Sequence, residues 1–237
     1  MTVKATQILR FFWTTIAHLI FPNTCLACKN ELAPSEGHIC SFCMNDLSFT
    51  HFQSYTEPTP MDKLFWGRVD ITSTYAHFNF EKNKASQEIL FGLKYKNNMQ
   101  VGIHFGKEIG KIIASHPSFH TASIIIPVPL HPKKQFLRGF NQSEVIARGI
   151  SETSLIPIDL HLITRNKHSE TQTKKDRFER WDNVSSIFSV SDNIKNISHV
   201  TIVDDVITTG STIESIIRSL RSKNPTLSIS VVTLAIA

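Results

Sequence analysis

The run from Val200 to Thr212 constrains the fold more than any other part of this sequence. Residues 200–203 are all apolar or β-branched, which is typical of a strand covered on both faces. Two carboxylates, Asp204 and Asp205, follow and are expected to end the strand. The small-residue loop 208–212 comes next, and apolar residues then recur at helical spacing. This order predicts a strand, an acidic pair, a tight loop and a helix.

The helix is expected to begin near Ser211, because Ser211 and Glu214 have the spacing of a capping box. Backbone N–H groups at a helix N-terminus, together with the helix dipole, favour a phosphate. Carboxylates at the carboxyl end of a strand suit sugar hydroxyls or a hydrated cation. An ordinary strand-to-helix turn would also use Thr, Gly and Ser, but it gives no reason for two adjacent acids at the end of a buried strand. The pattern therefore favours a sugar-phosphate site.

Length and composition are those of an ordinary globular protein. The chain has 237 residues, 41% hydrophobic and 19% charged, enough for one sizeable α/β core and a small appendage. Its formal charge of +5 permits an anionic ligand or nucleic acid without requiring either. No apolar run reaches the roughly 18–20 residues that a transmembrane helix needs. We expect a cytoplasmic protein, with a peripheral position at the inner face of the membrane as the alternative.

The four cysteines of the chain form two pairs in one short region. Cys25 and Cys28, then Cys40 and Cys43, have the spacing of two zinc knuckles separated by eleven residues. Two disulfides are the alternative, but nothing marks the chain as secreted. Four thiolates complete a tetrahedral shell, so His38 is expected to be a neighbour and not a ligand. A closed shell has no open position for substrate, and the zinc is therefore expected to be structural.

Composition divides the chain into four parts. Residues 1–22 are predicted to form an amphipathic helix that docks on the main domain, with a membrane-surface anchor as the alternative. Residues 23–50 are the zinc ribbon, and residues 51–68, which lack a hydrophobic period, are expected to be a linker. Residues 69–237 are the main domain.

Strands and helices alternate in the main domain, which predicts a mostly parallel, doubly wound sheet. The expected strands are 69–80, 122–126, a short one near 158, 186–190, the strand that begins at 200, and 227–236. The expected helices are 85–95, 102–115, 142–151 and the one that begins near 211.

A second buried strand ends in a proline-rich turn and a basic loop. Residues 124–130 read Ile-Ile-Ile-Pro-Val-Pro-Leu, and proline fixes the dihedral angles of the loop, so we expect its backbone amides, that of Val128 among them, to face an anionic group. Lys133, Lys134 and Arg138 would pair with its oxygens. A cationic surface loop is the alternative. Asn141, followed three residues later by an acid, has the spacing of a helix cap.

The segment 165–188 is long and polar for a connector. Long charged loops in α/β enzymes are commonly lids over the site, and its cations would also suit nucleic acid. The alternative is a solvent-exposed loop that has no functional role. The candidate lid or nucleic-acid contacts are Lys174, Lys175, Arg177 and Arg180 of this segment, together with Lys133 and Lys134 of the basic loop.

The acidic pair and its loop closely resemble the phosphoribosyl pyrophosphate (PRPP) signature of type I phosphoribosyltransferases. The resemblance implies that Asp204 and Asp205 hold the ribose 2′- and 3′-hydroxyls. It implies that the loop wraps the 5′-phosphate through Thr208, Thr209, Gly210, Ser211 and Thr212.

Further motifs narrow this resemblance to the competence protein F (ComF) family. They are the zinc ribbon, Lys94 within 92–95, Pro-Val-Pro-Leu-His at 127–131, Arg-Gly-Phe-Asn-Gln at 138–142, and Thr171-Gln172 with Arg180, Asn183-Val184 and Phe188. The likeness extends from Phe21 to the end of the chain. One departure is Lys175, where the family commonly has a hydrophobic residue.

The family resemblance implies a phosphoribosyltransferase fold and a part in natural transformation, where members handle incoming single-stranded DNA. If transfer occurs, the resemblance implies that Mg²⁺ binds the pyrophosphate and the ribose hydroxyls. Asp204 and Asp205 would then act as catalytic residues that stabilise the charge developing at the ribose. Three functions remain open. They are a Mg²⁺-dependent transferase with an unidentified acceptor, a DNA-handling competence factor with a PRPP site, and a non-catalytic adaptor for the uptake machinery.

Overall fold

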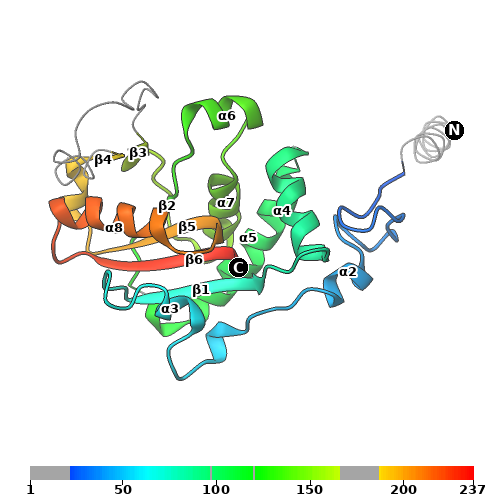
Figure 1. Cartoon of the computed structure of the whole chain (residues 1–237), viewed down its shortest axis with the longest axis horizontal. Helices are drawn as coiled ribbons and strands as arrows, with labels where there is room; N and C mark the ends of the chain where they lie inside the picture. Colours follow the sequence, from blue (N-terminus) through cyan, green and yellow to red (C-terminus); the bar gives the residue numbers. More distant parts are fainter. Residues whose placement is uncertain (1–21, 97, 120, 166–186) are drawn as a thin grey trace, which may run out of the picture.

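The computed structural model describes residues 22–96, 98–119, 121–165 and 187–237, and its core is one four-stranded sheet (Figure 1). The strand order is β1 (Ser73–Asn79), β6 (Ser228–Ile236), β5 (His199–Ile207) and β2 (Ile124–Pro127), and all pairings are parallel. The α-helices of the described residues are α2 (Ser41–Asn45), α3 (Pro60–Lys63), α4 (Ala85–Tyr95), α5 (Met99–Ser115), α6 (Pro132–Arg138), α7 (Gln142–Ser154) and α8 (Ser211–Lys223). The predicted α/β class with a parallel sheet is confirmed.

The central strand β5 continues through the acidic pair. Residues 200–203 are fully buried, as the apolar run predicted. The expectation that the acids end the strand is wrong, because β5 continues to Ile207 and Asp204 lies opposite Thr233 of β6. Strand pairing uses backbone groups alone, so acidic side chains are compatible with it once their carboxylates have partners.

Helices cover both faces of the sheet. Neighbouring residues of a strand point to opposite faces, and His77 of β1 faces α5, where its Nε2 lies 3.2 Å from Glu108 Oε2. Ala76, on the other face, lies opposite Thr233, whose hydroxyl contacts the sulfur of Met61 in α3 at 4.0 Å. α7 packs along α5, and the chain just after α3 contacts α8. The sheet is therefore wound on both faces, as predicted.

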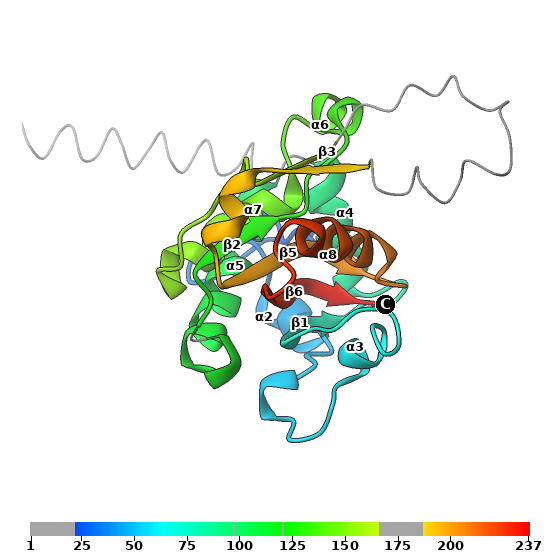
Figure 2. The same cartoon turned by 90° about the vertical axis from the view of Figure 1, so that its left-hand side faces the viewer.

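The sheet edge beside β2 carries the smaller elements. Ile158 forms a parallel bridge with Ile125, which is the short strand expected near residue 158. An antiparallel pair, β3 (Ile163–Arg165) and β4 (Phe188–Val190), follows. Both views place this pair and α6 at the same end of the molecule (Figures 1 and 2). Within the described residues, the remaining short helices are η1 (Phe52–Ser54), η2 (Pro117–Phe119) and η4 (Asp192–Asn196).

The segment 51–68 has more structure than the linker that the sequence predicts. It contains η1 and α3, and a capping box between Thr59 and Asp62 begins α3. Met61 and Phe65 are 0% and 1% exposed. Periodicity could not reveal this segment, because a four-residue helix is too short to show a helical repeat.

The cysteine-containing module is joined to the main domain by specific contacts. Thr50 N donates to His77 O at 3.1 Å and Asn79 N to Ser48 O at 2.8 Å, which extends pairing along β1. Asp46 meets the start of α4, where its carboxylate lies 2.8 Å from Lys84 Nζ. The helix predicted for residues 1–22 lies, up to residue 21, outside the described residues. None of the helices in the described part of the chain has the length and apolar character needed to span a membrane.

Glycines let α5 and α7 approach to backbone contact. A Cβ on Gly106 would lie 2.3 Å from Ile146 O and 2.9 Å from the Cα of Gly149, so neither helix could keep its position. These glycines therefore serve helix packing. This contact fixes α7, whose N-terminus reaches the acidic pair.

Replacing Gly106→Ala is expected to destabilise the protein by about 1–3 kcal/mol, because the methyl group would meet backbone that cannot rotate away. Urea unfolding measures the change. The matched control is Gly37→Ala, where a Cβ meets nothing within 4 Å, and its stability should stay within about 0.5 kcal/mol of wild type. Equal stability of the two variants would contradict this account of the α5–α7 contact.

Candidate functional site

The acidic pair on β5 is held by groups from two helices. Lys94 of α4 places its Nζ 3.0 Å from Asp205 Oδ2. Ser143, in the first turn of α7, donates its hydroxyl to Asp204 Oδ1 at 2.8 Å, and the Asp205 amide donates to the same oxygen at 2.9 Å. The acidic pair is therefore bound by the ammonium group of Lys94 and the hydroxyl group of Ser143, both of which come from distant parts of the chain.

The two acids have different electrostatic surroundings. Burial raises the pKa of the Asp204 carboxyl to about 7, and the neighbouring charge of Asp205 adds to this effect. The Ser143 hydroxyl, the Asp205 amide and Lys94 lower the pKa, but they do not cancel the rise. Asp204 therefore exchanges a proton near neutral pH and accepts hydrogen bonds from polar partners such as hydroxyl groups.

The candidate phosphate loop, residues 208–212, lies directly beyond the end of β5. Thr208 and Thr209 are exposed, and Gly210 is buried with φ 73°, a left-handed conformation that favours glycine. A Cβ on Gly210 would lie 3.0 Å from the ring of Phe65, so the loop rests on the segment that precedes β1.

The helix after this loop begins at Ser211, as predicted, but the predicted capping box is wrong. Gly210 is the N-cap, and Glu214 bonds to Arg68 and Arg218 instead of to the start of its own helix. The first backbone bond of α8 runs from Glu214 N to Gly210 O. The N–H groups of Ser211 and Thr212 precede it and have no carbonyl within the helix, the arrangement that binds phosphate.

The turn after β2 differs in part from expectation. Val128 is 7% exposed and its N–H donates to Val203 O at 2.9 Å, so this amide is not free for a pyrophosphate. Pairing with β5 simply continues one residue beyond β2. Asn141 caps α7 as predicted, since its side chain accepts from Ser143 N at 3.1 Å, and it also donates to Val128 O at 2.9 Å. One asparagine thus ties the turn to the helix that reaches Asp204.

The predicted basic residues lie at different places. Arg138 ends α6, where it bonds Gln142 Oε1 at 2.8 Å and lies 5.4 Å above the ring of Tyr95. Lys133 and Lys134 are exposed on the same helix. The proposed lid contacts Lys174, Lys175, Arg177 and Arg180 lie outside the described residues.

Two site residues were missed from the sequence. Ser143 follows the Arg-Gly-Phe-Asn-Gln run directly, and its place in the first turn of a capped helix was a usable signal. Arg68 touches the phosphate loop through Thr209 O at 2.7 Å, but it lies 141 residues away in a segment predicted to be a linker. Nothing in its sequence neighbourhood marked it.

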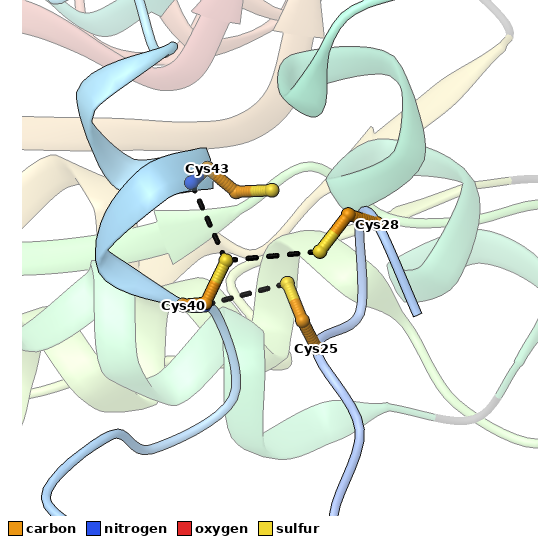
Figure 3. Close-up of side chains that lie close together, drawn as sticks. All are labelled: Cys25, Cys28, Cys40 and Cys43. Carbon is orange, nitrogen blue, oxygen red and sulfur yellow. Dashed lines mark hydrogen bonds between the residues drawn. The ribbon is translucent and has the colours of Figure 1, made fainter. Parts of the chain in front are cut away.

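The four cysteines converge on one point, as predicted (Figure 3). Their sulfur atoms all lie within 4.8 Å of one another, and Cys28 Sγ is 3.7 Å from Cys40 Sγ. A tetrahedral four-thiolate zinc with Zn–S near 2.3 Å places its sulfurs about 3.8 Å apart. The N–H of Cys40 points to Cys25 Sγ at 3.3 Å and that of Cys43 to Cys40 Sγ at 3.5 Å, contacts that favour thiolates. The cysteines are free of disulfides, and the cluster fits a structural metal site.

His38 is not part of that cluster of candidate ligands. The metal site lies next to α4, since a Cβ on Gly92 would be 2.7 Å from Leu26 in the first knuckle. The module with the metal site therefore packs against the helix that carries Lys94.

The fold and site define a parallel α/β protein with a four-cysteine metal module and an acidic pair beside a phosphate-type loop. No family model matches the chain. Competence protein F of Haemophilus influenzae is 40% identical over 217 residues, covering 85% of this chain and 92% of that protein. Competence protein ComFC of Bacillus subtilis is 26% identical over 90% of this chain and 83% of its own length. DNA utilization protein YhgH of Salmonella typhimurium strain LT2 is 33% identical over 85% of this chain and 92% of its length.

The chain therefore belongs to the competence protein F family, as its motifs predicted. Among solved structures, the PRPP amidotransferase of B. subtilis matches with a TM-score of 0.42 and 20% identity. That match covers 61% of this chain and 30% of the other, and it is too weak to establish a common fold.

The raised pKa of Asp204 predicts a pH-dependent stability. The native state keeps this proton up to a pH of about 7, whereas the unfolded chain releases it near a pH of about 3.9. Because the native state binds more protons between these values, the contribution of this group to stability falls as pH rises through that window. Asp204→Asn is expected to remove this dependence and to be more stable than wild type above pH 7.

Unfolding midpoints in urea from pH 4 to 8 measure the effect. Asp70→Asn is the matched control, because the Asp70 side chain is fully exposed and should leave the profile of wild type unchanged. If the urea midpoint of Asp204→Asn changed with pH in parallel with that of wild type, the raised pKa of Asp204 would be contradicted.

Proposed function

We propose that this protein binds PRPP at the carboxyl end of β5. The observation that carries the proposal is the meeting of the acidic pair with the phosphate loop at the start of α8. A sugar phosphate has adjacent hydroxyls at one end and a phosphate at the other, and this site offers carboxylates and helix N–H groups in the same order.

Each part of the site has a role in this proposal. Asp204 and Asp205 accept hydrogen bonds from the ribose 2′- and 3′-hydroxyls. The loop residues Thr208 to Thr212 enclose the 5′-phosphate with backbone N–H and hydroxyl groups. Arg138 offers the pyrophosphate a guanidinium that Gln142 and Tyr95 already orient.

The acids also suit the Mg²⁺ that would accompany a bound pyrophosphate. Oxygen ligands are what this ion prefers, and two adjacent carboxylates supply them. When bound, the ion would neutralise pyrophosphate charge. Lys94, whose Nζ lies 3.0 Å from Asp205 Oδ2, would balance part of the charge of that carboxylate, and Asp205 would offer its oxygens to the hydroxyls and the cation. We further propose zinc for the four-cysteine site, because its donor set is the one zinc takes in closed structural sites.

PRPP binding is tested by calorimetric titration of metal-loaded protein with and without Mg²⁺. Wild type should bind in the micromolar range, and Asp204→Asn with Asp205→Asn should bind at least about tenfold more weakly, since the hydroxyl acceptors lose their charge. Asp70→Asn serves again as the exposed-acid control. Absence of binding in wild type would reject the proposal, and release of pyrophosphate with a screened acceptor would extend it to transfer.

A second proposal concerns single-stranded DNA, which a specific surface favours. We define the α4–α6 surface as Phe91, Tyr95, Lys96 and Arg138, and the exposed ring of Phe136 is a further candidate on α6. The rings of Phe91 and Tyr95 lie 4.9 Å apart, and Lys96 and Arg138 each lie over one of these rings. Exposed rings beside cations are the combination that single-strand binders use for bases and phosphates. Relatives named for competence and for DNA utilization add support.

Phe136→Ala is expected to weaken binding of a labelled thymidine oligonucleotide by about 1–3 kcal/mol, the usual loss for one stacked base. Phe136 is 88% exposed, so its removal should not affect folding. Phe42→Ala is the matched control, because Phe42 is 87% exposed on the cysteine module. Fluorescence anisotropy measures both affinities. Equal affinity of the two variants would exclude Phe136 from the DNA site, and affinity independent of salt would exclude phosphate contacts.

A further inference from the structure

Arg68 joins the end of α3, four residues before it, to the phosphate loop and to α8, which lie 141 and 146 residues further along the chain. Its Nη1 donates to Leu64 O at 2.8 Å, where α3 ends, and to Thr209 O at 2.7 Å in the phosphate loop. Its Nε donates to Glu214 Oε2 at 2.9 Å, and Nη2 bonds the same oxygen. The side chain is 33% exposed, so most of it is enclosed by these partners.

We infer that Arg68 is a positioning residue for the phosphate loop, an inference that rests on the proposed PRPP site. A peptide unit is planar and trans, so its C=O and N–H point in opposite directions. When Arg68 holds the Thr209 carbonyl, it also directs the Gly210 N–H to the side away from the guanidinium. Gly210 needs such support because its left-handed φ leaves the glycine many alternative conformations.

Arg68 also neutralises the negative charge of Glu214 at the start of α8. Glu214 lies in the first turn of this helix, where an acid stabilises the helix but repels a phosphate. Arg218 reaches its Oε1 at 2.8 Å while Arg68 takes Oε2, so both carboxylate oxygens are paired with cations. Arg218 also donates to Arg68 O at 3.0 Å, which holds the backbone of Arg68 in place. Two cations and one anion thus stand beside the loop.

Phe65 supports the loop from the same segment. Its ring lies where a Cβ of Gly210 would be only 3.0 Å away, and the residue is 1% exposed. Phe65 thus limits how far the loop can sink, and Arg68 fixes the direction of its peptide. The segment before β1 thereby acts as the support of the phosphate loop.

The first measurement is hydrogen–deuterium exchange of the full-length protein without ligand. Arg68→Ala should speed exchange at the Glu214 amide, which donates to Gly210 O of the loop at 2.9 Å, by roughly tenfold. Arg68→Lys should behave in the same way, because one ammonium keeps the charge but cannot serve Leu64, Thr209 and Glu214 together. Arg148→Ala is the control, because Arg148 bonds Glu144 within its own helix and should leave the loop unchanged. Wild-type exchange in Arg68→Ala would overturn the inference.

The second measurement separates positioning from a general loss of stability. Ribose 5-phosphate uses the loop, whereas magnesium pyrophosphate does not. Arg68→Ala should bind ribose 5-phosphate about tenfold more weakly and pyrophosphate as wild type does. Equal weakening of both ligands would overturn the inference in favour of a merely structural role. If wild type binds neither ligand, the proposed PRPP function fails, and the exchange data alone decide the role of Arg68.

Discussion

Two adjacent carboxylates on the central strand are the constraint on which the rest of the structure depends. Asp204 stands at a position where burial and the neighbouring charge of Asp205 both oppose its ionisation. Lys94 of α4 pairs with Asp205, and the hydroxyl of Ser143 in α7 donates to Asp204. These helices come from different parts of the chain, so the sheet, its helical cover and the site are one arrangement.

The helix α4 connects the metal module to this site. Asp46 and Leu26 hold one side of α4, through Lys84 at its start and Gly92 in its middle. Lys94, two residues after Gly92, then reaches Asp205. A four-thiolate site supplies rigidity to a module too small to have a large core of its own. The metal module is therefore a structural element on which the position of Lys94 depends, although the cysteines themselves lie apart from the acids.

Local chemistry explains what could be predicted from the sequence. The apolar run 200–203 predicted the strand β5, the paired cysteines predicted the cysteine cluster, and Asn141 predicted a helix cap. Each of these depends on residues close together in the chain, where spacing alone fixes the geometry. The misassigned capping box at Ser211 shows the limit of such reasoning. Glu214 had the right spacing, but two arginines bind its carboxylate more strongly than the backbone N–H would.

The remaining site contacts join residues that are far apart, and spacing cannot reveal them. Arg68 meets a loop 141 residues away, and it does so from a segment without any helical or strand period. The hydrogen bond from the Val128 amide to Val203 O could not be predicted for a related reason, because β2 and β5 become neighbours only in the folded sheet. A motif therefore predicts which groups belong to a candidate site. The orientation of those groups is set by the partners behind them, and those partners become visible only when the chain is folded.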